Sequence, residues 1–319
     1  MTRDLHPDAK TDLHPDAAQF LRERQDRPGL HEVGAKAARR QHRQSAAATD
    51  DPEPVGSVED VVVRSDGHGV GVRLYVPEGP GPFPTLVWAH GGGFVLGDIE
   101  TEDPVGRALT NATDCLVASV DYRLAPEHKF PAALRDVYAV TEWASEEAGA
   151  YGGDPDRIAV GGASAGGSLA AATSLLARDR DGPAIDYQVL GYPAVSYDEE
   201  FPSNREYDGM FLEAEEREWV TDQYLPDPIH GYNPYAYPLK ASDLGDLPPA
   251  TVLTAGFDPL QDACKAYADR LADAGVDVTH RHFDDMIHSF LGRVGDPDWE
   301  RAREAHAAIG DDLDERFRG

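Results

Sequence analysis

From Val58 onward, short apolar segments alternate with segments of helical periodicity, and this alternation constrains the fold more than any other feature of the chain. Most of the apolar segments are continuous rather than alternating, as in parallel strands that are covered by helices on both faces. The sequence therefore predicts an α/β fold with a mostly parallel central sheet. The expected strands lie at 61–63, 70–76, 86–89, 116–120, 158–160, 189–190, 252–255 and 276–283, and the expected helices at 132–148, 168–177, 262–274 and 299–317.

The composition limits the classes of partner. The chain has 319 residues, of which 41% are hydrophobic, enough for one large domain or a domain with an inserted cap. Its formal net charge is -29, from 58 acidic and 29 basic residues, which argues against binding to nucleic acid or to anionic membranes. An ordinary acidic protein is one explanation. We favour adaptation to concentrated salt, where the Debye length falls to about 3 Å at 1 M and self-repulsion is screened.

Targeting and redox signals are sparse. The first residues contain no apolar core of a secretory signal, and the longest charge-free segment, 158–177, has the glycines and serines of a buried strand and helix. The two cysteines, Cys115 and Cys264, form neither a disulfide framework nor a zinc site. We therefore expect a cytoplasmic protein without membrane insertion, metal or cofactor.

The chain divides into four parts. Residues 1–55 are polar and helical in pattern, and they contain a near-duplication at 5–9 and 13–17. Residues 56–195 and 247–319 carry the strand and helix alternation. Residues 196–246 interrupt it with a segment that is rich in acids and aromatics and has one helical pattern at 213–224. Such a long excursion favours a cap over a surface insertion without function.

The segment Gly162-Ala163-Ser164-Ala165-Gly166 lies between an apolar strand and a helical run. This is the G-x-S-x-G pattern of a nucleophile elbow, in which a tight turn presents the serine hydroxyl and the glycines leave room for the turn. The pattern alone is weak, because small residues around a serine are common. It makes Ser164 a candidate nucleophile that depends on partners elsewhere.

A glycine-rich loop, His90-Gly91-Gly92-Gly93-Phe94, directly follows the strand at 86–89. Backbone N–H groups of consecutive glycines can approach a ligand closely. Two of them, together with the N–H of Ala165, could form an oxyanion hole, whereas the alternative is a flexible turn. We expect His90 to anchor this loop by hydrogen bonds rather than to act as a base.

A serine nucleophile requires a base and an acid, and in this type of fold the chain order is serine, acid, histidine. Asp258 follows the strand at 252–255, and His288 follows the next strand. Asp262, four residues beyond Asp258, is the competing acid. The candidate triad is therefore Ser164, Asp258 and His288.

The motifs together resemble one family. Their order over residues 74–290 is similar to that of the hormone-sensitive-lipase-like (family IV) carboxylesterases of the α/β-hydrolase superfamily. The matching segments are 90–93, 121–127, 130–133, 162–167, 247–250 and 258–262. The resemblance implies Ser164 as nucleophile, His288 as base and Asp258 as acid. It also implies Gly92, Gly93 and Ala165 as oxyanion donors and a cap built from residues 1–55 and 196–246.

The implied activity is hydrolysis of short- to medium-chain carboxylic esters, with a small ester as substrate and no cofactor. An amidase, lactonase or deacetylase could use the same triad, and a ligand-binding receptor with this fold is a further alternative. The oligomeric state is left open, with a homodimer among the options. Three departures from common family residues are Ala163, Ala263 and Ser289.

Overall fold

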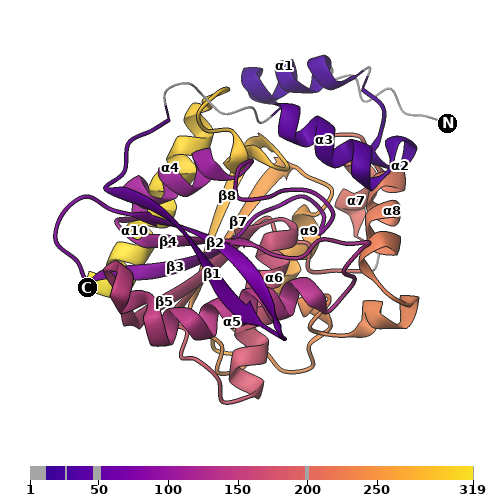
Figure 1. The fold of residues 1–319 in the computed structure, drawn as a ribbon. Helices are drawn as coiled ribbons and strands as arrows, with labels where there is room; N and C mark the ends of the chain where they lie inside the picture. Colours follow the sequence, from indigo (N-terminus) through magenta and orange to yellow (C-terminus); the bar gives the residue numbers. More distant parts are fainter. Residues whose placement is uncertain (1–11, 26, 46–51, 198–200, 319) are drawn as a thin grey trace.

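The computed structural model describes residues 12–25, 27–45, 52–197 and 201–318. Its centre is an eight-stranded sheet with the order β1-β2-β4-β3-β5-β6-β7-β8 (Figure 1). The first two strands form an antiparallel hairpin, β2 pairs antiparallel with β4, and every pairing from β4 to β8 is parallel. The strands are β1 (Ser57–Ser65), β2 (His68–Val76), β3 (Phe83–Ala89), β4 (Leu116–Asp121), β5 (Gly153–Ala163), β6 (Tyr187–Gly191), β7 (Ala250–Phe257) and β8 (Val278–Ile287).

Helices connect the strands and cover the sheet. The α-helices are α1 (Pro15–Arg24), α2 (Leu30–Val33), α3 (Ala35–Ser45), α4 (Asp103–Thr113), α5 (Ala132–Glu147), α6 (Ala165–Asp179), α7 (Pro202–Glu206), α8 (Ala214–Tyr224), α9 (Gln261–Asp273) and α10 (Glu300–Arg318). Short 3₁₀ helices are η2 (Ala148–Tyr151), η3 (Pro228–Tyr232), η4 (Pro238–Lys240) and η5 (Phe290–Gly292). The mostly parallel sheet with covering helices confirms the predicted α/β architecture.

Strand β3 shows how the sequence builds a core on each face of the sheet. Successive side chains of a strand point to opposite faces. Val87 and Ala89 pack into the apolar cluster that also contains residues of α5, α6 and α9. Leu86 and Trp88 pack into the cluster on the other face, which contains residues of α1, α4 and α10. Because all seven residues of β3 are buried, its sequence is mostly apolar rather than alternating, with Thr85 as the one polar residue.

One helix of the core, α4, was not among the predicted helices. Its sequence holds a glycine at its fourth residue, which weakens a helical signal. The structure explains the glycine, because a Cβ on Gly106 would lie only 2.3 Å from the ring of Tyr75. Packing between α4 and the sheet therefore overrides the local propensity.

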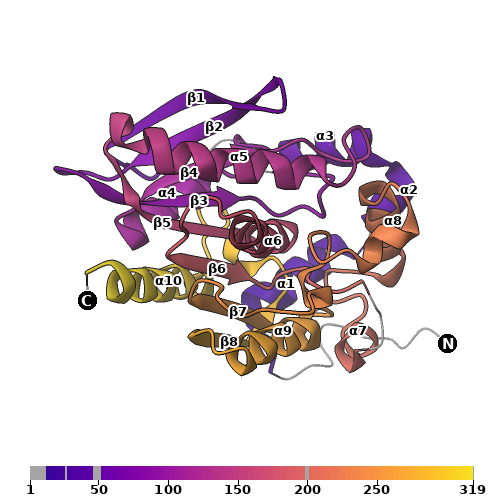
Figure 2. The same cartoon turned by 90° about the horizontal axis from the view of Figure 1, so that it is seen from below.

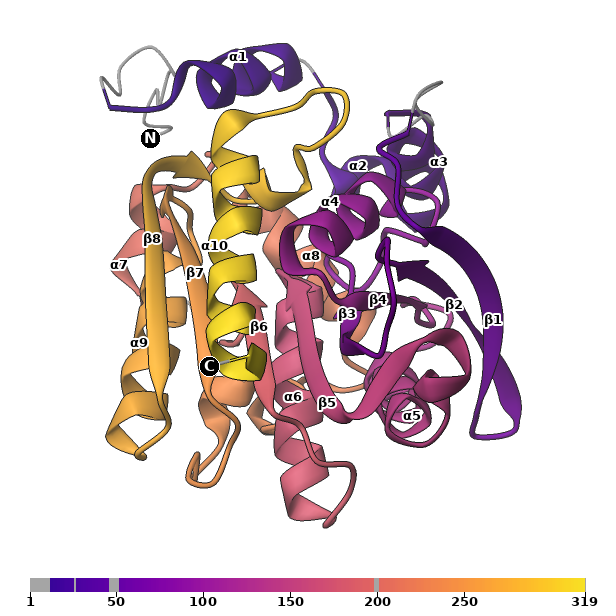
Figure 3. The ribbon, with the colours of Figure 1, turned by 90° about the vertical axis from the view of Figure 1, so that its left-hand side faces the viewer.

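The N-terminal helices lie over one end of the sheet (Figure 3). Helix α2 lies beside α8 in Figures 1 and 2, and the backbone N–H of Leu30 donates to Oε1 of Glu216 at 2.8 Å. The second copy of the near-duplicated segment forms the start of α1, with Asp16 in its first turn. The first copy, at 5–9, lies outside the described residues. Within the described part of the chain, no helix has the length and apolar character to cross a membrane.

Candidate active site

The G-x-S-x-G segment forms a sharp turn between β5 and α6. Ser164 has φ 56° and ψ -117°, a conformation that a non-glycine residue rarely adopts. A Cβ on Gly166 would lie 1.9 Å from the carbonyl oxygen of Ala89, and one on Gly162 would lie 2.4 Å from the backbone of Gly166. The N–H of Ser164 donates to the carbonyl of Gly191 at 2.7 Å, which fixes the turn at the end of β6. The two glycines are thus required by the turn that exposes Ser164.

The side chains of Ser164, His288 and Asp258 form one hydrogen-bonded chain. The Nε2 atom of His288 lies 2.8 Å from Oγ of Ser164, and its Nδ1 lies 2.8 Å from Oδ2 of Asp258. Because a carboxylate only accepts hydrogen bonds, Nδ1 carries the proton and Nε2 is free to accept from the serine hydroxyl. Asp258 and His288 are both buried. This arrangement can move a proton from the serine hydroxyl onto the imidazole.

The competing acid points elsewhere. Oδ2 of Asp262 accepts from the backbone N–H of Ser203 at 3.0 Å, at the start of α7. Oδ1 of Asp258 accepts instead from the N–H of Leu260 at 2.8 Å, which orients its carboxylate toward the imidazole. The structure therefore brings Asp258, and not Asp262, to His288.

The glycine loop lies directly against the serine turn. A Cβ on Gly91 would lie 3.2 Å from the carbonyl of Ala163 and 3.8 Å from Cβ of Ser164. Gly92 and Gly93 have φ of 114° and 61°, a region that favours glycine. Ala165 is the first residue of α6, where an N–H has no partner within its own helix. Gly91 thus lies beside the serine turn, Gly92 and Gly93 follow it in the loop, and Ala165 directly follows Ser164.

His90 has a structural environment. Its Nδ1 lies 2.7 Å from the carbonyl oxygen of Gly91, and its ring stacks on that of Tyr122 at 4.1 Å. The Tyr122 hydroxyl donates to the carbonyl of His90 at 2.9 Å. Burial lowers the pKa of His90 to about 4, so the ring is neutral near pH 7. These contacts agree with the prediction that His90 anchors the loop.

Aromatic rings surround the imidazole of His288. The ring of Tyr192 is 4.7 Å from it and that of Phe211 is 6.1 Å from it, centroid to centroid. Ser289 has φ 72°, so this position requires the left-handed region that favours glycine. Ala163 belongs to the apolar cluster that also contains Tyr192. Its methyl group suits that surrounding.

Sequence reasoning did not single out Arg39 of α3, whose guanidinium binds the backbone just after the glycine loop. Its Nε donates to the carbonyl of Val95 at 2.7 Å and its Nη2 to that of Ala125 at 2.6 Å. The same guanidinium binds both carboxylate oxygens of Glu127, at 2.9 and 2.7 Å. No sequence pattern links these residues, because Arg39 is more than fifty positions from each of them.

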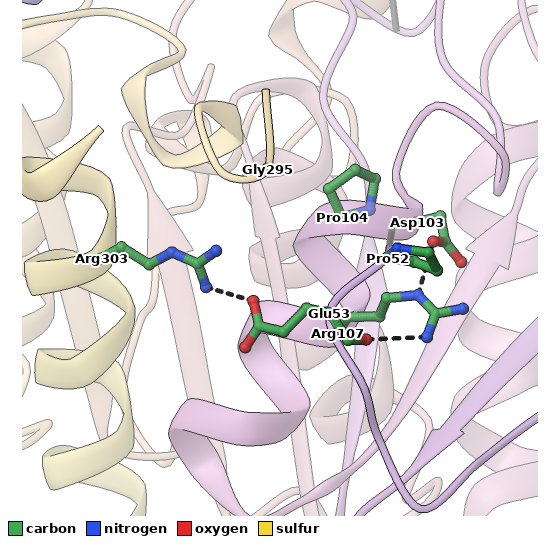
Figure 4. Close-up of a pocket in the computed structure, with 7 residues that line it drawn as sticks. All are labelled: Pro52, Glu53, Asp103, Pro104, Arg107, Gly295 and Arg303. Atoms are coloured by element: carbon green, nitrogen blue, oxygen red, sulfur yellow. Dashed lines mark hydrogen bonds and ion pairs between the residues drawn. The ribbon is translucent and has the colours of Figure 1, made fainter. Parts of the chain in front are cut away.

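A cavity of about 370 Å³ with several charged lining residues lies away from the triad and the glycine loop (Figure 4). Its two arginines already have partners, since Arg107 binds Asp103 at 2.7 Å and Arg303 binds Glu53 at 2.6 Å. None of the triad or glycine-loop residues lines it; the lining consists of Pro52, Glu53, Asp103, Pro104, Arg107, Gly295 and Arg303.

Among the described residues, no three His, Cys, Asp or Glu side chains are grouped so that they could hold a metal ion.

Known proteins resemble the chain in both sequence and structure. A family model described as alpha/beta hydrolase fold matches residues 86–292. An arylesterase from Saccharolobus solfataricus is 42% identical over 242 residues, which cover 75% of this chain and 79% of the relative. An ethyl acetate hydrolase from Pseudomonas putida is 36% identical over 275 residues, covering 83% and 86%.

Solved structures agree with these relatives. A hyperthermophilic esterase from the archaeon Pyrobaculum calidifontis has a TM-score of 0.89 and 39% identity, with 95% of this chain and 98% of that chain covered. A thermostable esterase from Pseudomonas putida has a TM-score of 0.92 at 31% identity, covering 97% and 98%. The chain belongs to the alpha/beta hydrolase fold family and is a serine carboxylesterase of its hormone-sensitive-lipase-like branch.

Proposed function

We propose that this esterase hydrolyses short- to medium-chain carboxylic esters through an acyl-enzyme on Ser164, with His288 as base and Asp258 as acid. The observation that carries the proposal is the unbroken hydrogen-bonded chain from Ser164 through His288 to Asp258, with both distances at 2.8 Å. A nucleophile and a base in hydrogen-bond contact, with the base oriented by a third group, are what acyl transfer requires.

The proposed reaction has two halves. Oγ of Ser164 attacks the ester carbonyl while Nε2 of His288 takes its proton; the C–O bond to the alcohol then breaks, and the imidazolium returns the proton to the leaving alkoxide. Water next attacks the acyl-enzyme with His288 again as base, which releases the carboxylic acid and restores the serine. Asp258 holds the imidazole tautomer and stabilises the imidazolium in both halves.

The negative charge that forms on the carbonyl oxygen requires donors that are already in place. We assign this role to the backbone N–H groups of Gly92, Gly93 and Ala165. Support comes from the glycine loop lying against the serine turn and from the position of Ala165 at the helix N-terminus, where the helix dipole also favours negative charge. Loss of one such donor typically lowers kcat by about 10²- to 10³-fold.

Two segments form the proposed cap, residues 1–55 and 196–246, over a core of residues 56–195 and 247–319. Helix α8 contacts the glycine loop, because a Cβ on Gly93 would lie 3.0 Å from Val220. The ammonium of Lys129 donates to the carbonyls of Asp222 and Leu225 at 2.6 and 2.9 Å, which ties the core to the end of α8. These contacts place α8 beside the glycine loop, which supports its assignment to the cap.

Replacement of Ser164 by alanine tests the proposal. We expect Ser164→Ala to lose hydrolysis of p-nitrophenyl butyrate and labelling by a fluorophosphonate, with an unchanged thermal midpoint. A series of p-nitrophenyl esters from acetate to palmitate should give its highest kcat/KM at eight carbons or fewer. Retained turnover in the alanine variant would overturn the assignment of the nucleophile, and an optimum at long chains would overturn the substrate range.

The acidic composition leads us to propose that the enzyme is adapted to concentrated salt. With a net charge of -29, self-repulsion in dilute buffer opposes the compact state, and molar salt screens it. We expect the thermal midpoint and kcat to rise between 0.05 and 2 M KCl. If both were unchanged over this range, the adaptation would be excluded.

For the cellular setting we propose the cytoplasm, because Cys115 and Cys264 are both buried free thiols, which suits a reducing compartment.

We also propose a homodimer. The supporting feature is the edge strand β1, on which the side chain of Val62 is 73% exposed. Light scattering after gel filtration distinguishes a dimer from a monomer.

A further inference from the structure

Two arginines from distant parts of the chain converge on one aromatic ring near the catalytic histidine. The Cζ atom of Arg293 lies 4.0 Å from the ring centroid of Phe20, and that of Arg24 lies 5.7 Å from the same centroid. Arg24 and Phe20 belong to α1, whereas Arg293 directly follows η5. Both guanidiniums therefore gather where α1 meets the loop that follows His288.

This arginine pair borders the catalytic centre. Cζ of Arg24 is also 4.8 Å from the ring centroid of Phe211, whose ring is in turn 6.1 Å from that of His288. The charge of Arg293 acts on the hydroxyl of Tyr192, the other ring beside His288. One aromatic layer thus separates the imidazole from the two positive charges.

The two guanidiniums lack counter-ions. Among the described residues, no carboxylate oxygen lies within 4.0 Å of a side-chain nitrogen of either arginine, although both side chains are partly buried. Glu213 and Glu216 attract Arg24 only at longer range. Acids outnumber basic residues by 58 to 29, and other arginines, such as Arg73 with Asp60 and Glu100, have close acidic partners. An unpaired, partly buried pair of like charges is costly unless an anion joins it.

The electrostatics agree with this geometry. Burial, with a smaller contribution from the neighbouring Arg24, lowers the pKa of Arg293 to about 10. Burial likewise lowers the pKa of His42, with Arg293 and Arg24 acting in the same direction and Asp98 opposing them. Arg24 and Arg293 therefore form a local positive charge in an acidic protein, and this charge favours a bound anion.

We propose that the preferred substrates are anionic esters whose own carboxylate binds between Arg24 and Arg293 while the ester carbonyl lies at Ser164. The proposal rests on the function assigned above. Guanidinium groups match a carboxylate through paired hydrogen bonds. Half-esters of dicarboxylic acids have this chemistry.

The test compares monoethyl esters of succinic to suberic acid with ethyl esters of monocarboxylic acids of equal chain length. The assays contain 1 M NaCl, so that the overall negative charge is screened over about 3 Å. We expect at least one half-ester to be preferred over its neutral counterpart by about tenfold or more in kcat/KM. In Arg24→Gln and Arg293→Gln this preference should be lost, mainly through a higher KM for the half-esters.

Arg180→Gln is the matched control. Arg180 also lies over an aromatic ring, 5.8 Å from the centroid of Tyr138, and its loss changes the net charge equally, so the preference should survive. Inhibition by free adipate gives a readout without turnover, and its Ki should rise about tenfold in Arg293→Gln. Equal rates for half-esters and neutral esters, or a preference that survives both glutamine variants, would overturn this inference alone. Failure to hydrolyse either ester series would overturn the proposed function and the inference with it.

Discussion

Asp262 follows Asp258 by only four residues, yet the two carboxylates hold different partners. Oδ2 of Asp258 lies 2.8 Å from the imidazole of His288, whereas Oδ2 of Asp262 accepts from the backbone N–H of Ser203 at 3.0 Å. The difference arises because Asp258 still lies at the end of β7, before α9 begins at Gln261. We propose that the first carboxylate serves the reaction, whereas the second joins α9 to α7.

Replacement of each aspartate by asparagine separates these roles. Asp258→Asn should lower kcat by about 10³- to 10⁴-fold, because an amide opposite Nδ1 favours the wrong imidazole tautomer. Asp262→Asn keeps an oxygen that can accept from Ser203, so kcat should change by less than about threefold. The kcat values on a short-chain p-nitrophenyl ester provide the measurement, and a larger loss in the Asp262 variant would exchange the two assignments.

The catalytic serine and its partners could be predicted from sequence because each is marked locally. Ser164 lies in a short motif whose glycines are required by the turn, and Asp258 and His288 follow recognisable strands in a fixed order. Sequence reasoning favoured Asp258 over the competing Asp262, but the contacts that distinguish them, with His288 and with Ser203, are visible only in the tertiary structure.

The residues around the triad could not be predicted in the same way. Phe211, Arg24 and Arg293 come from the loop between α7 and α8, an N-terminal helix and the segment after His288, and only the tertiary fold brings them together. Helix α4 was missed for a related reason, because Gly106 weakens its signal but is required by the ring of Tyr75. Long-range packing leaves no short motif in the sequence.

Arg39→Gln should reduce turnover although Arg39 lies far from Ser164 in the sequence. Its guanidinium donates to the carbonyls of Val95 and Ala125, and the first of these directly follows the glycine loop. Without these bonds the loop is less well fixed, so we expect kcat to fall about tenfold with KM changed less than threefold. Initial-rate kinetics measure this split between kcat and KM.

Glu127→Gln is the control for Arg39. It removes the negative charge of the ion pair but keeps both hydrogen bonds from Arg39 to backbone carbonyls. The Glu127 side chain is 55% exposed. Because exposed ion pairs contribute at most about 1 kcal/mol, kcat should stay within twofold of the wild type. Equal losses in both variants would instead attribute the effect to the ion pair.

Gly166→Ala should disrupt the serine turn. Its new Cβ would lie 1.9 Å from the carbonyl oxygen of Ala89 and 2.5 Å from that of His90, and both contacts involve backbone. We expect the free energy of unfolding to fall by about 3 kcal/mol or more, as for severe overpacking, together with loss of activity. In the control variant, Gly149→Ala, nothing lies within 4 Å of the new methyl group. Urea denaturation should shift strongly for the first variant only, and equal shifts would contradict the steric explanation.

His306 of α10 provides a pH dependence of stability that is separate from catalysis. Burial lowers its pKa to about 4, Arg303 lowers it further, and the carbonyl of Leu291 opposes the shift. In the unfolded chain the pKa of a histidine is about 6.5. The unfolded state therefore binds the proton more readily between pH 4 and 6.5, so the contribution of His306 is present above pH 6.5 and is lost as the pH falls toward 4.

His306→Leu should make the loss of stability on acidification less steep in this window. We expect the difference in the free energy of unfolding between pH 7 and pH 4.5 to shrink by roughly 1 to 3 kcal/mol, because a buried leucine has no proton to gain. Urea denaturation at a series of pH values measures it. His128→Gln is the control, since His128 is exposed and its replacement should leave the slope unchanged. An equally steep loss of stability in His306→Leu would show that other groups, such as the carboxylates, account for the whole acid sensitivity.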